Sequence, residues 1–222
     1  MKLVLYSGYD DDNRLIDQEI VPLIGKSSPR VTFIPSAHYV PEFEYEYLSE
    51  AYAEYGIRNI SIFNADQPFS SSQLEKALNT DLIYLGGGNT FYFLYWIKRQ
   101  GLDTRLRQFV ARGGVLAGLS AGAIIMTPSI ATASYPKFDR DHNDVKIEDL
   151  TALGFVSFEF FPHYEAVEEY AKELRKQSKK ISWPIYGVDD GGGIIVNHHS
   201  LRFFGRVWGY VGGKEFKVHP FD

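Results

Sequence analysis

Residues 114–126 read G-V-L-A-G-L-S-A-G-A-I-I-M, and this segment carries the strongest local signal in the chain. An apolar, strand-like run leads into a G-x-S-x-G pattern around Ser120, and a helix-like run follows it. A serine placed between a strand and a helix, with small residues on both sides, is typical of a nucleophile elbow. Glycine suits such a turn because backbone segments approach closely there and because it tolerates unusual backbone angles. The Ala121 N–H, at the start of the next helix, is then a candidate oxyanion donor.

The sequence before the elbow alternates between short apolar runs and amphipathic stretches. Strand-like runs occupy residues 2–7, 30–37, 57–64 and 81–87, and helix-like stretches occupy 13–25, 43–56, 70–80 and 89–113. The helix at 70–80 has a start that resembles a capped one, with its serines and Glu75. This rhythm predicts an α/β fold with a doubly wound, mainly parallel sheet and helices on both faces. A chain of 222 residues is expected to form a single domain, 1–222.

The sequence after the elbow predicts a long loop and a different kind of sheet. Residues 131–148 are polar and aperiodic, and long ordered loops are often functional. Strand-like runs at 154–161, 184–189 and 191–197 flank a charged helix at 165–180. We expect the remaining residues, 201–219, to form a short C-terminal antiparallel β meander that closes one edge of the sheet.

Composition excludes several classes of function. The net charge of −5 and the pI near 5.7 offer no broad attraction to nucleic acid or to anionic lipid. The chain has no run of 18 apolar residues, and its start turns acidic after six residues, so we expect a cytoplasmic protein without a membrane segment. The absence of cysteine rules out disulfides, thiolate metal sites and a cysteine nucleophile.

A glycine loop, G-G-G-N-T at residues 86–90, follows the strand-like run at 81–87 and precedes a helix. Such a loop can cradle a phosphate, but neither the P-loop pattern nor G-x-G-x-x-G with its acidic partner is present, so we expect no cofactor. Loops at the carboxyl ends of parallel strands meet in one crevice. The Gly88 N–H is therefore a candidate second oxyanion donor, and the alternative is a tight turn with an Asn or Thr helix cap.

A serine nucleophile needs a general base, and the chain has six histidines: His38, His142, His163, His198, His199 and His219. His163 ends the strand-like run S-F-E-F-F-P-H, where a loop after the strand would bring it to the crevice of Ser120. The alternative for such a histidine is a half-buried ring without chemistry. The base must be oriented by a carboxylate, and the loop at 139–144 offers Asp139, Asp141 and Asp144. This loop lacks the glycine and glutamate of an EF-hand, so we expect no metal.

Three separate motifs together resemble the peptidase E family, the aspartyl dipeptidase and cyanophycinase-like serine peptidases. They are L-G-G-G-N-T-F at 85–91, G-L-S-A-G-A at 118–123 and A-L-G-F-V-S-F-E-F-F-P-H at 152–163. The resemblance spans essentially the whole chain and implies a class I glutamine amidotransferase-like fold. Those amidotransferases use a cysteine at the elbow, whereas this chain has none and requires serine chemistry.

The resemblance implies a triad of serine, acidic residue and histidine in that chain order, with Ser120 as nucleophile and His163 as base. It also implies an oxyanion hole formed by Gly88 and Ala121. At the distance after the elbow where the family has its aspartate, this sequence has Ser134 and Tyr135. Counting back from His163 leads to Asp141, with Asp139 and Asp144 as alternatives.

The expected activity is hydrolysis of a short peptide by a dipeptidase or exopeptidase, through an acyl-enzyme. The family carries an arginine-bearing segment after its histidine, but residues 164–175 read Y-E-A-V-E-E-Y-A-K-E-L-R, which would repel a substrate carboxylate. A neutral or basic first residue is thus as plausible as aspartate. Candidate substrate-binding residues are Asn89, Glu165 and Asp190. Alternatives are an esterase or amidase with the same triad, and a non-catalytic binding module; a homodimer is one option for assembly.

Overall fold

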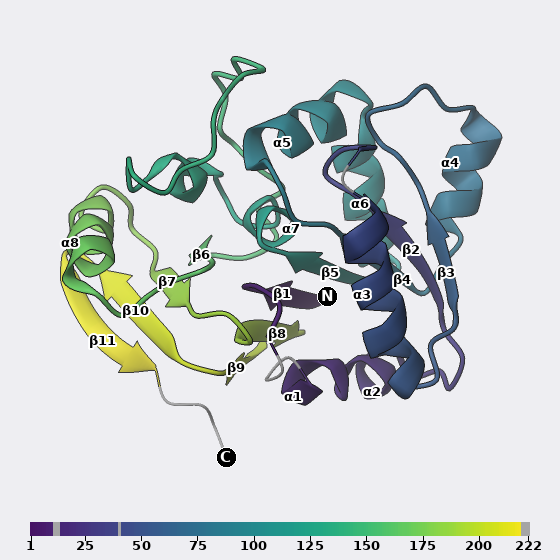
Figure 1. The fold of residues 1–222 in the computed structure, drawn as a ribbon, viewed down its shortest axis with the longest axis horizontal. Helices are drawn as coiled ribbons and strands as arrows, with labels where there is room; N and C mark the ends of the chain where they lie inside the picture. The colour runs from purple at the N-terminus through teal and green to yellow at the C-terminus, as the bar shows by residue number, and fades with distance from the viewer. Residues whose placement is uncertain (11–13, 40, 219–222) are drawn as a thin grey trace.

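Five strands of this computed structural model, which describes residues 1–10, 14–39 and 41–218, pair in parallel as the sequence pattern predicts. They are β1 (Lys2–Tyr6), β2 (Arg30–Ile34), β3 (Asn59–Ile62), β4 (Leu82–Leu85) and β5 (Val115–Leu119). Two antiparallel strands, β8 (Gly193–Asn197) and β9 (Ser200–Phe204), extend the sheet beyond β1. The strand order is β3-β2-β4-β5-β1-β8-β9, so β5 lies at the centre and carries the elbow (Figure 1).

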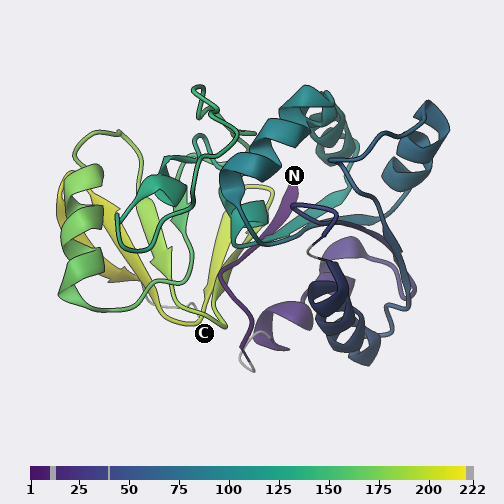
Figure 2. The same cartoon turned by 45° about the horizontal axis from the view of Figure 1, so that its top comes forward.

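Helices cover both faces of this sheet, as Figure 2 shows. One face is covered by α1 (Arg14–Asp17), α2 (Ile20–Ile24) and α3 (Pro41–Glu54), and the other by α4 (Ser71–Leu78), α5 (Thr90–Arg99), α6 (Leu102–Ala111) and α7 (Ala121–Ile124). The period of two along a strand produces these two cores, because Leu3 and Leu5 of β1 pack with one cluster and Val4 and Tyr6 with the other.

Two details of the helices differ from the expectation. The capping box of α4 joins Ser70 and Gln73, not Glu75, because Gln73 lies three residues after the cap and its side chain accepts the Ser70 N–H. The helix-like stretch at 89–113 forms two helices, since Gly101 adopts a left-handed backbone angle, φ 67°, between α5 and α6.

The C-terminal strands pair in antiparallel fashion as expected, but they do not all close the edge of the main sheet. A second sheet has the order β11-β10-β7-β6, formed by β6 (Glu159–Phe161), β7 (Ile185–Val188), β10 (Val207–Val211) and β11 (Lys214–Val218). Helix α8 (Glu168–Gln177) lies beside this sheet (Figure 1). The sheet has an aromatic core of its own, which includes Tyr164, Tyr170 and Tyr210. Burying these rings against α8 gives β10 and β11 a partner that the main sheet lacks.

The pairing of β6 with β7 positions the candidate site. These two strands are parallel, with Phe161 opposite Gly187, so the residues that follow each strand emerge side by side. The long loop runs from a short 3-10 helix, Ala131–Ser134, toward the start of α5. Among the helices of the described residues, none is long and apolar enough to cross a membrane.

Glu159 on β6 is a buried carboxylate whose titration should affect stability. It accepts hydrogen bonds from Thr127 Oγ1 (3.0 Å) and Trp183 Nε1 (3.2 Å), and burial raises the pKa of Glu159 to about 7. Because this folded-state pKa exceeds the unfolded value, the folded protein binds more protons, and stability falls as pH rises toward 7. Glu159→Gln should remove that part of the slope and raise the free energy of unfolding at pH 8 by roughly 2–3 kcal/mol.

Urea unfolding of wild type and Glu159→Gln at pH 5 and pH 8 measures this effect. The gain should be largest at pH 8 and small at pH 5, where the wild-type side chain is already protonated. Equal pH slopes in the two proteins would show that the carboxylate stays ionised in the fold.

Candidate active site

Ser120 lies on a sharp turn between β5 and α7, with φ 47° and ψ −107°. Its N–H donates to Tyr6 O on β1 at 3.0 Å, which fixes the strained residue to the neighbouring strand. The glycines on either side are required by close approach: a Cβ on Gly122 would lie 2.2 Å from Leu85 O, and one on Gly118 would lie 2.4 Å from the Gly122 carbonyl carbon. The half-buried serine is thus held at the carboxyl end of the sheet.

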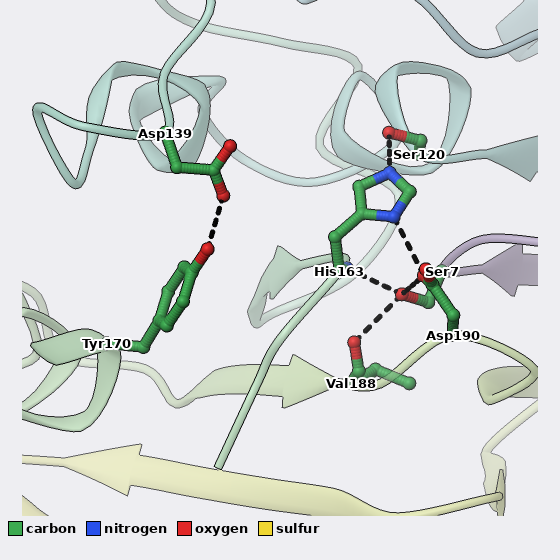
Figure 3. Close-up of polar contacts among 7 residues, drawn as sticks. All are labelled: Ser7, Ser120, Asp139, His163, Tyr170, Val188 and Asp190. Atoms are coloured by element: carbon green, nitrogen blue, oxygen red, sulfur yellow. Dashed lines mark hydrogen bonds and ion pairs between the residues drawn. The ribbon is translucent and has the colours of Figure 1, made fainter. Parts of the chain in front are cut away.

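His163 follows β6, and its Nε2 lies 2.9 Å from Ser120 Oγ (Figure 3). The residue has a positive φ of 54°, an angle that a side-chain-bearing residue rarely adopts. Its backbone N–H donates to Ser7 Oγ at 2.7 Å, and Ser7 in turn donates to Val188 O at 2.8 Å. Ser7, buried just after β1, therefore ties the histidine backbone to β7.

The carboxylate at the other imidazole nitrogen is that of Asp190, with Oδ1 2.7 Å from His163 Nδ1. A carboxylate only accepts, so Nδ1 carries the proton and Nε2 is left to accept from the Ser120 hydroxyl. The hydrogen bond and charge of His163 hold the pKa of Asp190 below its ordinary value, so the carboxylate is ionised at neutral pH. Gly8 provides the space that this carboxylate occupies, because a Cβ on Gly8 would lie 2.1 Å from Asp190 Oδ1.

The structure corrects the prediction that Asp141 orients His163, because the carboxylate at the imidazole is that of Asp190. Asp141 Oδ2 accepts the Thr90 N–H at the start of α5 (2.7 Å). Of the alternatives, Asp139 accepts from the Tyr170 hydroxyl (2.7 Å), a pair that Figure 3 draws apart from the imidazole ring, and Asp144 is exposed. Asp141 is bound at the start of α5, whereas Asp190 follows β7, the parallel neighbour of β6.

Ser7 is the residue that sequence reasoning missed. Its only signal is its place directly after the first strand, in K-L-V-L-Y-S, where a strand end meets the same edge of the sheet as Ser120. Asp190 was considered for substrate binding because it also follows a strand, and the structure instead brings it to the imidazole.

The other candidate bases do not contact Ser120 in the described chain. His38 Nδ1 lies 2.8 Å from Asp66 Oδ2, which forms a second histidine–carboxylate pair after β2 and β3. His142 contributes its backbone carbonyl to Asn89 Nδ2 (2.8 Å). His198 follows β8 in a tight turn, together with His199. His219 lies outside the described residues.

The two candidate oxyanion donors belong to loops that are joined by a hydrogen bond. The Gly122 N–H donates to Gly86 O at 3.1 Å, which connects the elbow to the glycine loop. Within the described part of the chain, the N–H groups of Gly88 and Ala121 have no protein acceptor. Asn89 is less suited to substrate, because its side chain caps α5 by accepting the Tyr92 N–H (2.9 Å) and also donates to the 131–148 loop.

A cavity of about 470 Å³ opens beside the imidazole and is strongly acidic. Its lining includes His163 and Glu165, which are exposed, and Asp190. The remaining lining residues are Asp10, Asp139, Tyr164, Ala166, Tyr170, Asp189, Arg206 and Trp208. Arg206, the only lysine or arginine among the described residues of this lining, forms an ion pair with Asp189. No group of three or more metal-ligating side chains is found among the residues described.

Comparison with known proteins places this geometry in a family. Residues 3–204 match the model of peptidase family S51. The chain is 29% identical over 215 residues to the uncharacterized peptidase YgaJ of Bacillus subtilis, covering 94% of this chain and 86% of that protein. It is 32% identical over 169 residues to the uncharacterized peptidase Lmo0363 of Listeria monocytogenes, covering 73% and 77% of the two chains.

The relatives also include proteins named peptidase E. That of Salmonella typhi is 27% identical over 238 residues, which covers 97% of this chain and 96% of the relative. A crystal structure of a Listeria monocytogenes protein assigned to peptidase E superposes with a TM-score of 0.72 at 23% identity, over 98% of both chains. The α/β fold with its mainly parallel sheet and antiparallel C-terminal strands is therefore shared with that structure.

Proposed function

This chain belongs to peptidase family S51 and is a serine-type peptidase, and from its site we propose that it hydrolyses short peptides through an acyl-enzyme on Ser120. The observation that carries the proposal is the hydrogen-bonded series of Ser120 Oγ, the His163 imidazole and the Asp190 carboxylate. Nucleophile, base and orienting acid each lie within hydrogen-bond distance of the next, which is the arrangement a serine hydrolase requires.

In the proposed reaction, His163 Nε2 takes the Ser120 proton as the hydroxyl oxygen attacks the peptide carbonyl. The tetrahedral oxyanion is received by the Gly88 and Ala121 N–H groups, which have no acceptor among the residues that the structure describes. His163 then gives its proton to the leaving amine, and an acyl-enzyme remains. A water molecule, activated by the same imidazole, hydrolyses the ester and frees Ser120. Asp190 keeps the ring in the reactive tautomer throughout.

The acidic cavity supports the substrate class. Among the described residues, five carboxylates line it against one arginine, which is already paired with Asp189. A substrate carboxylate would therefore meet like charge, and an ammonium or guanidinium would be attracted. Trp208, which is half-buried, adds aromatic surface that suits a cation. We infer that the free amino group or a basic side chain of a short peptide binds here, near Glu165, and that aspartyl substrates are disfavoured.

A panel of X-p-nitroanilides and dipeptides with aspartyl, leucyl and lysyl first residues tests this preference. We expect kcat/KM for the lysyl substrate to exceed that for the aspartyl one by at least about tenfold, which corresponds to roughly 1.4 kcal/mol. Glu165→Gln should narrow the ratio, whereas Glu148→Gln, an exposed substitution outside this cavity, should leave it unchanged. A preference for the aspartyl substrate would contradict the inferred specificity.

The same panel, with p-nitrophenyl esters added, tests the activity itself when Ser120→Ala is run beside wild type. Cleavage of esters without cleavage of any peptide would favour an esterase or amidase that uses the same residues. A cytoplasmic location and a homodimer stay predictions from the sequence.

A further inference from the structure

The glycine loop at residues 86–90 is held by two carboxylates, one on each side of Gly88. Glu44 Oε1 accepts the Gly87 N–H at 2.7 Å, and Asp141 Oδ2 accepts the Thr90 N–H at the same distance. These acceptors come from elements far apart in sequence, α3 and the 131–148 loop. Two amides lie between them, those of Gly88 and Asn89, and neither has an acceptor within the described residues. The loop is therefore fixed at both ends, and the Gly88 N–H between them is left without a partner in that part of the chain.

Glu44 is a costly residue to place at this position. Its side chain is buried against the sheet, with 5% of the residue exposed, and burial raises the pKa of Glu44 to about 6. The hydrogen bond from the Gly87 N–H is much shorter than the one from the Tyr9 hydroxyl, which lies 3.5 Å away. Burial of a carboxylate is unfavourable unless the carboxylate is hydrogen-bonded. Here the hydrogen bond fixes the backbone one residue before Gly88.

The backbone of Gly86 joins the glycine loop both to β2 and to the elbow. Gly86 donates its N–H to Ile34 O (2.9 Å) and accepts the Gly122 N–H through its carbonyl (3.1 Å). A shift of the loop would therefore change the spacing between the Gly88 and Ala121 N–H groups. Oxyanion donors act only when they are held at hydrogen-bond distance from the developing charge.

We propose that Glu44 and Asp141 are positioning residues of the oxyanion hole, which hold the glycine loop so that the Gly88 N–H points to the reacting carbonyl. This inference rests on the proposed function, in which Gly88 is an oxyanion donor. Neither carboxylate touches substrate. What each supplies is an acceptor oxygen for a backbone N–H, so an amide side chain of the same shape can replace it and a methyl group cannot.

Paired substitutions test this role. We expect Glu44→Ala to lower kcat about 10²-fold with little change in KM, because the lost contact acts only when the oxyanion forms. Glu44→Gln should restore most of the rate. Asp141→Ala and Asp141→Asn should show the same contrast at the outer end of the loop, where the half-buried site makes misfolding a small concern. The rate of Ser120 labelling by a fluorophosphonate should fall in parallel with kcat, since its phosphoryl oxygen occupies the oxyanion position.

Asp17→Ala is the matched control for loss of a buried acid. Asp17 is similarly buried on the same face of the sheet, burial likewise raises its pKa to about 6, and it binds the Tyr6 hydroxyl instead of the glycine loop. This variant should lose stability but keep its kcat and labelling rate. Equal losses in the alanine and amide variants, or a kcat unchanged by Glu44→Ala and Asp141→Ala, would overturn the positioning role.

The controls separate this inference from the proposed function. If wild type is neither labelled at Ser120 nor active on peptides, the proposed function fails first. If wild type is labelled and active but the alanine variants match it, only the positioning role fails.

Discussion

Ser120→Ala is expected to lower kcat by about a millionfold, the largest effect of any single substitution in this protein. The hydroxyl is the only group that His163 Nε2 contacts at hydrogen-bond distance among the described residues, so no other side chain is poised to attack. Removal of the nucleophile leaves the oxyanion donors and substrate binding, which by themselves retain a rate roughly 10³–10⁴ above that of water. Steady-state turnover of the best peptide substrate, with active-site titration, measures the loss.

Ser134→Ala provides the control for this substitution. Ser134 is half-buried in the 131–148 segment and donates to the Ala131 carbonyl, so it should keep wild-type turnover. If Ser120→Ala retained a rate within about tenfold of wild type after contaminating activity is excluded, Ser120 would not be the nucleophile and the reaction would need another path.

Asp190→Asn is expected to lower kcat about 10⁴-fold. The asparagine side chain can offer an N–H to His163 Nδ1, which favours the tautomer with its proton on Nε2. That ring can no longer take the Ser120 proton. The geometry of the site should survive, because His163 is also held through its backbone N–H by Ser7. The measurement is kcat in wild type and variant, with a thermal melt to show that the fold persists.

Asp141→Asn tests whether the acidic member of the triad is Asp190 or Asp141, the residue that the chain order of serine, acid and histidine suggests. Asparagine keeps an oxygen acceptor for the Thr90 N–H, so its kcat should stay within a few-fold of wild type. If Asp141→Asn showed the 10⁴-fold loss and Asp190→Asn did not, the acidic member would be Asp141 and the loop would rearrange when substrate binds.

Several features of the protein followed from local sequence. The alternation of short apolar runs with amphipathic stretches predicted the parallel sheet covered on both faces, because periods of 2 and 3.6 record which side chains face a core. The spacing of three motifs pointed to the family that the comparison shows. Ser120 and His163 could be singled out because each lies just beyond the end of a strand, where the backbone delivers side chains to the carboxyl edge of a sheet.

The second sheet could not be read from the same patterns. Strands β9, β10 and β11 are all short runs with turns between them, and nothing local distinguishes a strand that joins β8 from one that joins β7. The choice depends on which partner buries the aromatic residues around Tyr164 and α8, and that is a property of the packed core.

By itself, therefore, the sequence determined the fold class, the elbow and the histidine after a strand, all of which depend on neighbours along the chain. Only the tertiary structure decided which carboxylate meets the imidazole. The sequence pointed to Asp141 and offered Asp190 only for substrate binding, yet β6 and β7 run in parallel and bring Asp190 to His163, while the Thr90 N–H binds Asp141 at α5. A hydrogen bond depends on distance in space, and the pairing of distant strands is what sets that distance.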